Sequence, residues 1–105
     1  MTLITFERTG SYAGNEIDFD LKLESLQENE AKRLQKMIDN SDFFNIPTNN
    51  EQTATPDKFL YGITVDDGNK YHTVRFTDAT MPKSILPLVR ELTMRNVLIR
   101  TVTTR

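Results

Sequence analysis

The chain offers few side chains that could carry out acid–base chemistry or hold a metal ion, because its 105 residues include one histidine and no cysteine. The histidine, His72, lies in phase with Val74 and Phe76 in an alternating stretch. This phase predicts that it packs at the margin of a sheet with one ring nitrogen hydrogen-bonded. Zinc normally takes three or four His, Cys or carboxylate ligands, and this sequence could add only carboxylates to one imidazole. We therefore expect no catalytic histidine, no metal site and no cofactor.

Two pairs of aspartates are the other candidates for acid–base work. Asp18 and Asp20 alternate with apolar residues, so both should lie on the solvent face of a strand, whereas Asp66 and Asp67 fall in a turn. Carboxylates outside a pocket are usually solvated and do not usually carry out acid–base catalysis. None of the serines has a nearby base in the sequence. We predict that the protein has no catalytic residues and is not an enzyme.

The stretch Gly10–Gly14 is the most distinctive local motif, because its two glycines frame Tyr12 between two alternating apolar patterns. The glycines lack the spacing of a nucleotide-binding loop, and a strand follows them instead of a helix, which argues against a phosphate cradle. Two interpretations stay open. The stretch is either a tight turn that needs a positive φ at one or both glycines, or a shaped loop that displays Tyr12 to a partner.

Composition and charge indicate one ordinary globular domain. A chain of 105 residues with 37% apolar and 27% charged residues can bury roughly two-thirds of its unfolded surface. Zero cysteine excludes disulfides and is compatible with a reducing cytoplasm. Glu7 interrupts the apolar run that a secretory signal would need, and no stretch reaches membrane-spanning length. With a net charge of −2 and both signs mixed, we expect a cytoplasmic protein without nucleic-acid or membrane partners.

Alternation of apolar and polar residues predicts a first antiparallel hairpin. Residues 4–6 and 16–23 alternate strictly, and the Gly10–Gly14 loop joins them. The sequence Ser25-Leu26-Gln27-Glu28 matches a capping box, in which the serine hydroxyl and the glutamate carboxylate satisfy free backbone N–H groups. We therefore expect a helix that begins at Ser25–Glu28 and ends near residues 40–42.

An exposed loop and a second hairpin come next. Residues 47–56 contain one apolar side chain in ten residues and should form the loop. Residues 59–65 and 72–76 alternate on either side of a strong turn signal at residues 66–69. The last helix should begin near Ser84, with a proline in its first turn, where a missing N–H costs little.

The order strand, strand, helix, strand, strand, helix predicts an α+β fold, in which an antiparallel four-stranded sheet carries both helices on one face. This single domain should span residues 1–95. The β-branched tail, residues 96–105, either adds a fifth strand or is disordered. The expected core joins strand residues Ile4, Phe6, Phe19, Leu21, Phe59, Ile63, Val74 and Phe76 to helix residues Leu34, Ile38, Leu88 and Leu92.

Several short motifs in this order resemble the emfourin family. They are Phe6-Glu7-Arg8-Thr9-Gly10-Ser11-Tyr12-Ala13-Gly14, then Phe43-Phe44-Asn45-Ile46-Pro47, Asp57-Lys58-Phe59-Leu60-Tyr61 and His72-Thr73-Val74, followed by a leucine-rich helix. The resemblance covers about residues 3–93. It departs from the family at Gly10-Ser11, where a Gly-Gly pair is common, and in the tail after Met94. Members are small bacterial cytoplasmic proteins that inhibit thermolysin-like zinc metalloproteases, protealysin among them.

The resemblance implies that surface loops block a protease cleft. The Gly10–Gly14 loop suits this task, and the 47–56 loop would form a wedge with it if both leave the same end of the sheet. The implied protease-binding residues are Arg8, Gly10, Ser11, Tyr12, Ala13, Gly14, Asp57, Tyr61 and His72, of which Arg8, Asp57, Tyr61 and His72 mostly brace the loops.

The resemblance leaves two matters open. The protease zinc could be blocked sterically or ligated by Glu51 or Asp57. The protein could instead be a non-inhibitory adaptor, or a domain that self-associates through the strand expected in its tail, although we expect a monomer.

Overall fold

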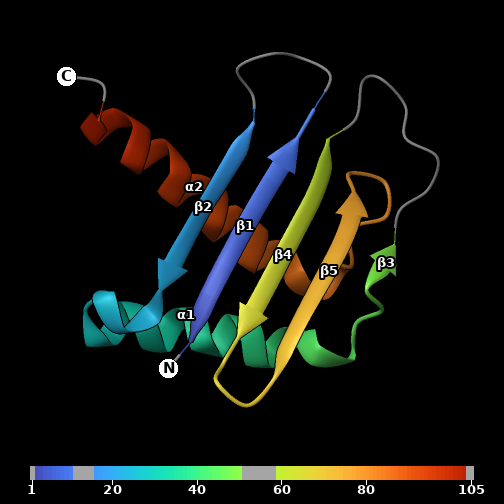
Figure 1. Cartoon of the computed structure of the whole chain (residues 1–105), viewed down its shortest axis with the longest axis horizontal. Helices are drawn as coiled ribbons and strands as arrows, with labels where there is room; N and C mark the ends of the chain where they lie inside the picture. The colour runs from blue at the N-terminus through green and yellow to red at the C-terminus, as the bar shows by residue number, and fades with distance from the viewer. Residues whose placement is uncertain (1, 11–15, 51–58, 104–105) are drawn as a thin grey trace.

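The computed structural model describes residues 2–10, 16–50 and 59–103, which form a five-stranded sheet with two helices on one face (Figure 1). The strands are β1 (Leu3–Thr9), β2 (Ile17–Lys22), β3 (Asn49–Asn50), β4 (Leu60–Asp66) and β5 (Tyr71–Thr77), and the helices are α1 (Glu28–Ser41) and α2 (Leu86–Thr103). The spatial order of the strands is β2-β1-β4-β5-β3. The four long strands pair antiparallel, so the predicted α+β arrangement is confirmed.

The core lies between the sheet and the helices, because the period-2 faces of the strands and the apolar stripes of the helices bury each other. Nine of the twelve residues expected there are buried: Ile4, Phe6, Leu34, Ile38, Ile63, Val74, Phe76, Leu88 and Leu92. The other three, Phe19, Leu21 and Phe59, are partly buried and pack against that cluster. The expected core is therefore confirmed, with its weakest coverage at these three positions.

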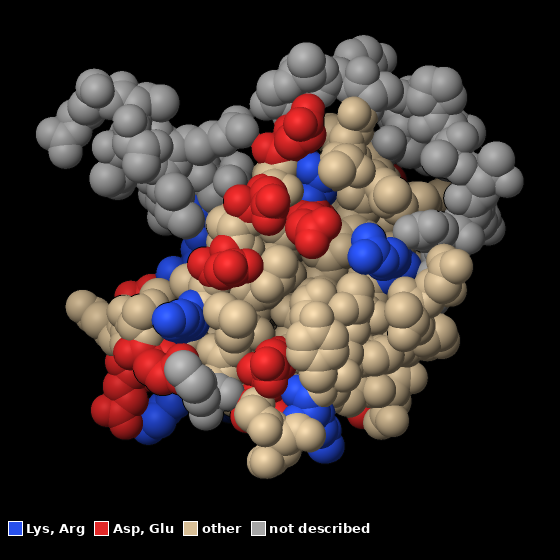
Figure 2. Space-filling view, in the orientation of Figure 1, with Lys and Arg blue, Asp and Glu red and all other residues tan. Residues whose placement is uncertain are grey.

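The opposite face of the sheet carries polar side chains and no helix. Asp18 and Asp20 are exposed there, as the alternation predicts, and Glu7 lies directly opposite Asp18 in the register of β1 and β2. Thr5 donates a hydrogen bond of 2.9 Å to Asp20. Figure 2 views this face and shows acidic side chains over β1 and β2. Both carboxylates are therefore exposed to solvent, as expected for this face of the strand.

The helix α1 begins at Glu28, within the expected stretch, but the capping box is wrong, because the N-cap is Gln27 and no side chain caps the helix. Leu23 is buried, and its N–H donates to the Thr2 carbonyl at 3.0 Å, so the chain continues beside β1 before it turns. Residues Leu23–Ser25 then form a short 3-10 turn, in which the Ser25 hydroxyl donates to the Lys22 carbonyl at 2.6 Å. The hydroxyl is therefore directed backwards and does not cap α1. The helix ends as expected, with Asp42 in the left-handed conformation at φ 55°.

The expected strand in the tail is also wrong, because residues 96–103 continue α2 as a helix. Once a helix has begun, each further residue gains a hydrogen bond at little cost, whereas a strand would need a free sheet edge to pair with. A β-branched residue lowers helix stability by under about 0.7 kcal/mol relative to alanine, and this cost is too small to end α2. The fifth strand comes instead from β3, which pairs in parallel with β5 at Arg75 and Phe76.

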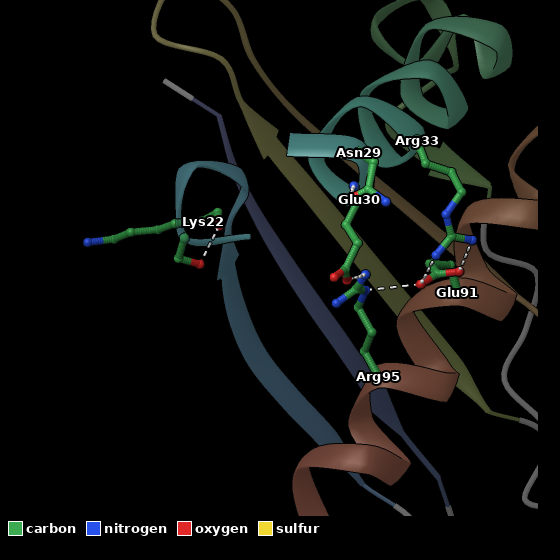
Figure 3. Close-up of polar contacts among 7 residues, drawn as sticks. Lys22, Asn29, Glu30, Arg33, Glu91 and Arg95 are labelled. Atoms are coloured by element: carbon green, nitrogen blue, oxygen red, sulfur yellow. Dashed lines mark hydrogen bonds and ion pairs between the residues drawn. The ribbon is translucent and has the colours of Figure 1, made fainter. Parts of the chain in front are cut away.

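An ion-pair network joins the two helices (Figure 3). Arg33 of α1 donates to both carboxylate oxygens of Glu91 on α2, at 2.9 and 3.2 Å. Arg95 donates to Glu91 at 3.0 Å and crosses to Glu30 of α1 at 2.7 Å. The side chains of Arg95 and Glu91 are each only 15% exposed, so solvent screens these contacts less than it screens a surface pair. The network fixes how α2 crosses α1.

Candidate functional site

Part of the predicted 47–56 loop is wrong, because Asn49–Asn50 form β3 within it. The two loop segments that remain, 11–15 and 51–58, are attached to the same end of the sheet. Thr9, at the end of β1, pairs with Leu60 at the beginning of β4, and Leu60 also pairs with Thr77 of β5. Asn50, the last residue of β3, pairs with Phe76 on the other side of β5. The residues that flank segments 11–15 and 51–58 therefore lie along one edge of the molecule (Figure 1). This is the adjacency that a two-loop wedge requires.

The ring of Phe59, the residue that follows segment 51–58, contacts Gly10, the residue that precedes segment 11–15. The guanidinium carbon of Arg8 is 4.3 Å from the ring centroid, which is a cation–π contact. Gly10 approaches the same ring so closely that a Cβ atom there would lie 2.6 Å from two ring carbons, Cδ1 and Cε1. Gly10 is needed for this close approach. Gly10 does not have a positive φ, and among the described glycines only Gly68, in the β4–β5 turn, has one. Gly14, the other glycine of the tight-turn interpretation, lies outside the described residues.

Asp78 holds the beginning of β4 from the other side. Its carboxylate accepts hydrogen bonds from the Phe59 backbone N–H at 3.1 Å and from the Tyr61 hydroxyl at 2.9 Å. The ring of Tyr61 stacks on Phe76 with centroids 5.1 Å apart and meets Phe59 edge-on at 6.2 Å. We call Arg8, Gly10, Phe59, Tyr61 and Asp78 the loop-root cluster.

The charge state of the loop-root cluster follows from these contacts. Burial, together with the hydrogen bond to the Asp78 carboxylate, raises the pKa of Tyr61 to about 12, and the nearby Arg8 guanidinium opposes part of that rise. Tyr61 therefore stays protonated at neutral pH. It acts there as a hydrogen-bond donor to Asp78.

Asp78 is absent from the residues predicted from sequence. The signal that could have found it is the register of the second hairpin, in which Tyr61 pairs with Phe76 and Leu60 with Thr77, so that Phe59 comes opposite Asp78. The turn signal at residues 66–69 locates the hairpin, but it fixes the register only to within a residue or two. The partner of a residue beyond the strand end was therefore not predictable.

His72 is not part of the loop-root cluster. It pairs with Val65 toward the other end of β5, and its Nε2 donates to the Ile46 carbonyl at 2.6 Å. The rings of Phe43 and Phe44 lie beside it, with centroids 5.7 and 6.4 Å from the imidazole. This confirms the prediction of a partly buried histidine at the margin of the sheet. It fixes the chain that leads into β3, and so the start of segment 51–58.

The remaining predicted site residues lie outside the described residues: Ser11, Tyr12, Ala13, Gly14 and Asp57, together with Glu51 as a candidate zinc ligand. Within residues 2–10, 16–50 and 59–103, no three histidine, aspartate or glutamate side chains are grouped so that they could hold a metal ion. In the same part of the chain, no helix has the length and apolar character needed to cross a membrane. The loop-root cluster therefore forms a common, tightly packed base for the two loop attachments.

Comparison with models of protein families gives a match over most of the chain. The model of the emfourin family matches residues 6–93, which run from the middle of β1 through β2, α1, β4 and β5 to the first turns of α2. The chain belongs to the emfourin family. This membership implies a role in inhibiting metalloproteases and makes a protease the expected partner. Comparison with curated proteins and with solved structures gives no match.

Proposed function

We propose that this emfourin inhibits thermolysin-like zinc metalloproteases, protealysin-like enzymes among them, by placing segments 11–15 and 51–58 in the active-site cleft. Family membership supports the inhibitory role. The single observation that carries the location is the common base of the two segments: Gly10, which precedes the first, packs against Phe59, which follows the second.

The fold supports such a role because a loop held by a sheet loses little conformational entropy when it binds. Segment 11–15 connects β1 and β2, which pair from Leu3 and Lys22 to Arg8 and Ile17, and segment 51–58 connects β3 to β4. The loop-root cluster holds one end of each, at Gly10 and at Phe59. A protease cleft would therefore receive a surface whose ends are already positioned.

Within this proposal the predicted residues have two roles. Ser11, Tyr12, Ala13 and Gly14 would contact the protease, with Tyr12 as the principal anchor, whereas Asp57 would brace the loops unless it ligates the protease zinc. Arg8, Gly10, Tyr61 and His72 act through the loops, since the contacts that the structure gives them hold the loop ends.

The protease zinc would be blocked in one of two ways. A loop could fill the cleft sterically, or the carboxylate of Glu51 or Asp57 could ligate the metal. Asp57→Asn and Glu51→Gln distinguish the two, because an amide is a much weaker zinc ligand of nearly the same shape. Loss of inhibition in one of these variants, with the melting temperature unchanged, would indicate ligation. Retained inhibition in both would indicate steric blocking.

The test of the function is titration of the purified protein into thermolysin and a protealysin-like enzyme with a peptide substrate. We expect residual activity to fall linearly to an end point near one inhibitor per protease. Undiminished activity under excess inhibitor, across several enzymes of this class, would reject the proposal. It would favour the alternative of a non-inhibitory interaction domain. Self-association through a tail strand is no longer a basis for that alternative, because residues 96–103 are helical.

The proposal also covers location and chemistry. We propose that the protein acts in the cytoplasm as a monomer, without catalytic activity of its own and without nucleic-acid partners. Sedimentation of the free protein and of its complex with the protease tests the monomer, since a one-to-one complex should carry the mass of one copy of each chain.

A further inference from the structure

Phe59 and Gly10 are in direct contact at one end of the sheet. Gly10 is the residue immediately before segment 11–15, and Phe59 is the residue immediately after segment 51–58. A Cβ atom at position 10 would lie 2.6 Å from the ring, a distance that real Cβ contacts do not show, so no space separates the two residues. A displacement of either residue therefore displaces the other.

The Phe59 ring has little freedom to absorb such a displacement. Arg8 lies over the ring at 4.3 Å, and Tyr61 meets it edge-on. Asp78 accepts a hydrogen bond from the Phe59 backbone N–H at 3.1 Å, and the ring packs against the buried core. A substitution that moves the ring must disturb one of these contacts. The beginning of β4 would then move with it.

We propose that Phe59 is a positioning residue that couples Gly10, which follows β1, to the beginning of β4, so that the two loop attachments respond together to a substitution at either residue. This inference rests on the proposed function. It has a specific consequence: the cost of a substitution at Gly10 depends on whether the Phe59 ring is present, because residues in contact contribute non-additively.

The test compares Gly10→Ala, Phe59→Ala and the double variant as inhibitors of a thermolysin-like protease, with the melting temperature of each. We expect Gly10→Ala to weaken inhibition by about tenfold, equivalent to ~1.4 kcal/mol, because its Cβ displaces the ring. In the Phe59→Ala background the ring is gone. Adding Gly10→Ala there should change the inhibition constant by less than about twofold.

Gly62→Ala is the matched control, because a Cβ at this glycine of β4 would meet its nearest side chain, Arg75, at an ordinary 3.7 Å. We expect it to inhibit like the unsubstituted protein. Three results would overturn the coupling: a Gly10→Ala variant that inhibits normally once corrected for its folded fraction, losses that multiply in the double variant, or an equal loss in Gly62→Ala.

Amide chemical shifts of the free variants separate this inference from the proposed function. Gly10→Ala should shift amide resonances of residues 51–58, and Phe59→Ala should shift those of residues 11–15. Absence of these shifts between the segments overturns the coupling even if the protein inhibits a protease. Their presence in a protein that inhibits no protease supports the coupling and rejects the proposed function.

Discussion

The Tyr61 hydroxyl donates a hydrogen bond of 2.9 Å to the Asp78 carboxylate, and this contact joins the beginning of β4 to the residue that follows β5. The same carboxylate accepts the Phe59 backbone N–H. One exposed aspartate thus holds both the side chain and the main chain at the base of the loops. Hydrogen bonds to a charged acceptor contribute more than neutral ones, so this contact should be measurable.

Tyr61→Phe should lower the free energy of unfolding by about 1 to 2 kcal/mol, because it removes the donor and keeps the ring that stacks on Phe76. Urea denaturation at neutral pH measures the loss. Tyr71→Phe is the control, since Tyr71 is 72% exposed, and its substitution should leave stability within about 0.5 kcal/mol. Equal stability of the Tyr61→Phe variant and the unsubstituted protein would show that the bond contributes nothing.

Alkaline pH gives an independent check on the same pair. The folded state raises the Tyr61 pKa from 10.0 to about 12, so it holds the hydroxyl proton more tightly than the unfolded state does. The stabilising contribution should be complete below pH 10 and should be lost as pH rises from 10 toward 12. Unfolding of the unsubstituted protein should therefore depend more steeply on pH in this window than unfolding of Tyr61→Phe. Parallel curves would contradict the pKa shift.

His72→Leu should destabilise the protein by about 1 to 3 kcal/mol, because it leaves the Ile46 carbonyl without the donor that lies 2.6 Å away. His72→Gln is the matched control, since its amide N–H lies near the position of Nε2 and should restore part of the stability. Thermal and urea unfolding of both variants measure the difference. If the two substitutions are equally harmful, ring packing against Phe43 and Phe44 explains the role of His72, and the hydrogen bond does not.

The helix network predicts a contrast between two ion pairs. Arg95→Ala should cost about 1 to 3 kcal/mol of unfolding free energy, because it removes contacts to Glu91 and Glu30 from a site that is 15% exposed. Lys32→Ala breaks a pair with Glu28 whose side chains are 76% and 83% exposed, and should cost less than about 0.5 kcal/mol. Urea denaturation at low and high salt measures both. Similar losses in the two variants would contradict the assigned role of the network.

The strands and turns were predictable from sequence because their signals are local. Alternation at residues 4–6 and 16–23 selects the inward face without reference to the rest of the chain, and the turn at residues 66–69 joins its own neighbours. The capping-box prediction was wrong because the hydrogen bond from Leu23 to Thr2 keeps the chain beside β1 before the helix begins. The strand predicted for the tail was wrong because propagation of the helix that begins at Leu86 outweighs the β-strand propensity of the tail residues.

The candidate site was predictable only in part, for a related reason. The glycines and Tyr12 identify a loop, but the contact between Gly10 and Phe59 exists only once β1 and β4 pair in one register. The same holds for Asp78, whose partners lie 17 and 19 residues away in the chain. His72 was predicted correctly because its alternation with Val74 and Phe76 is local.

The most direct test of the account compares two tyrosines as inhibitory anchors. Tyr12 lies in segment 11–15, whereas Tyr71 is exposed at the opposite end of the sheet, paired with Asp66. We predict that Tyr12→Ala weakens inhibition of a thermolysin-like protease by roughly thirtyfold, equivalent to ~2 kcal/mol, with the melting temperature nearly unchanged. Tyr71→Ala should inhibit like the unsubstituted protein. Equal inhibition constants for the two variants, or a Tyr12→Ala protein that melts early while its folded fraction inhibits normally, would contradict the account.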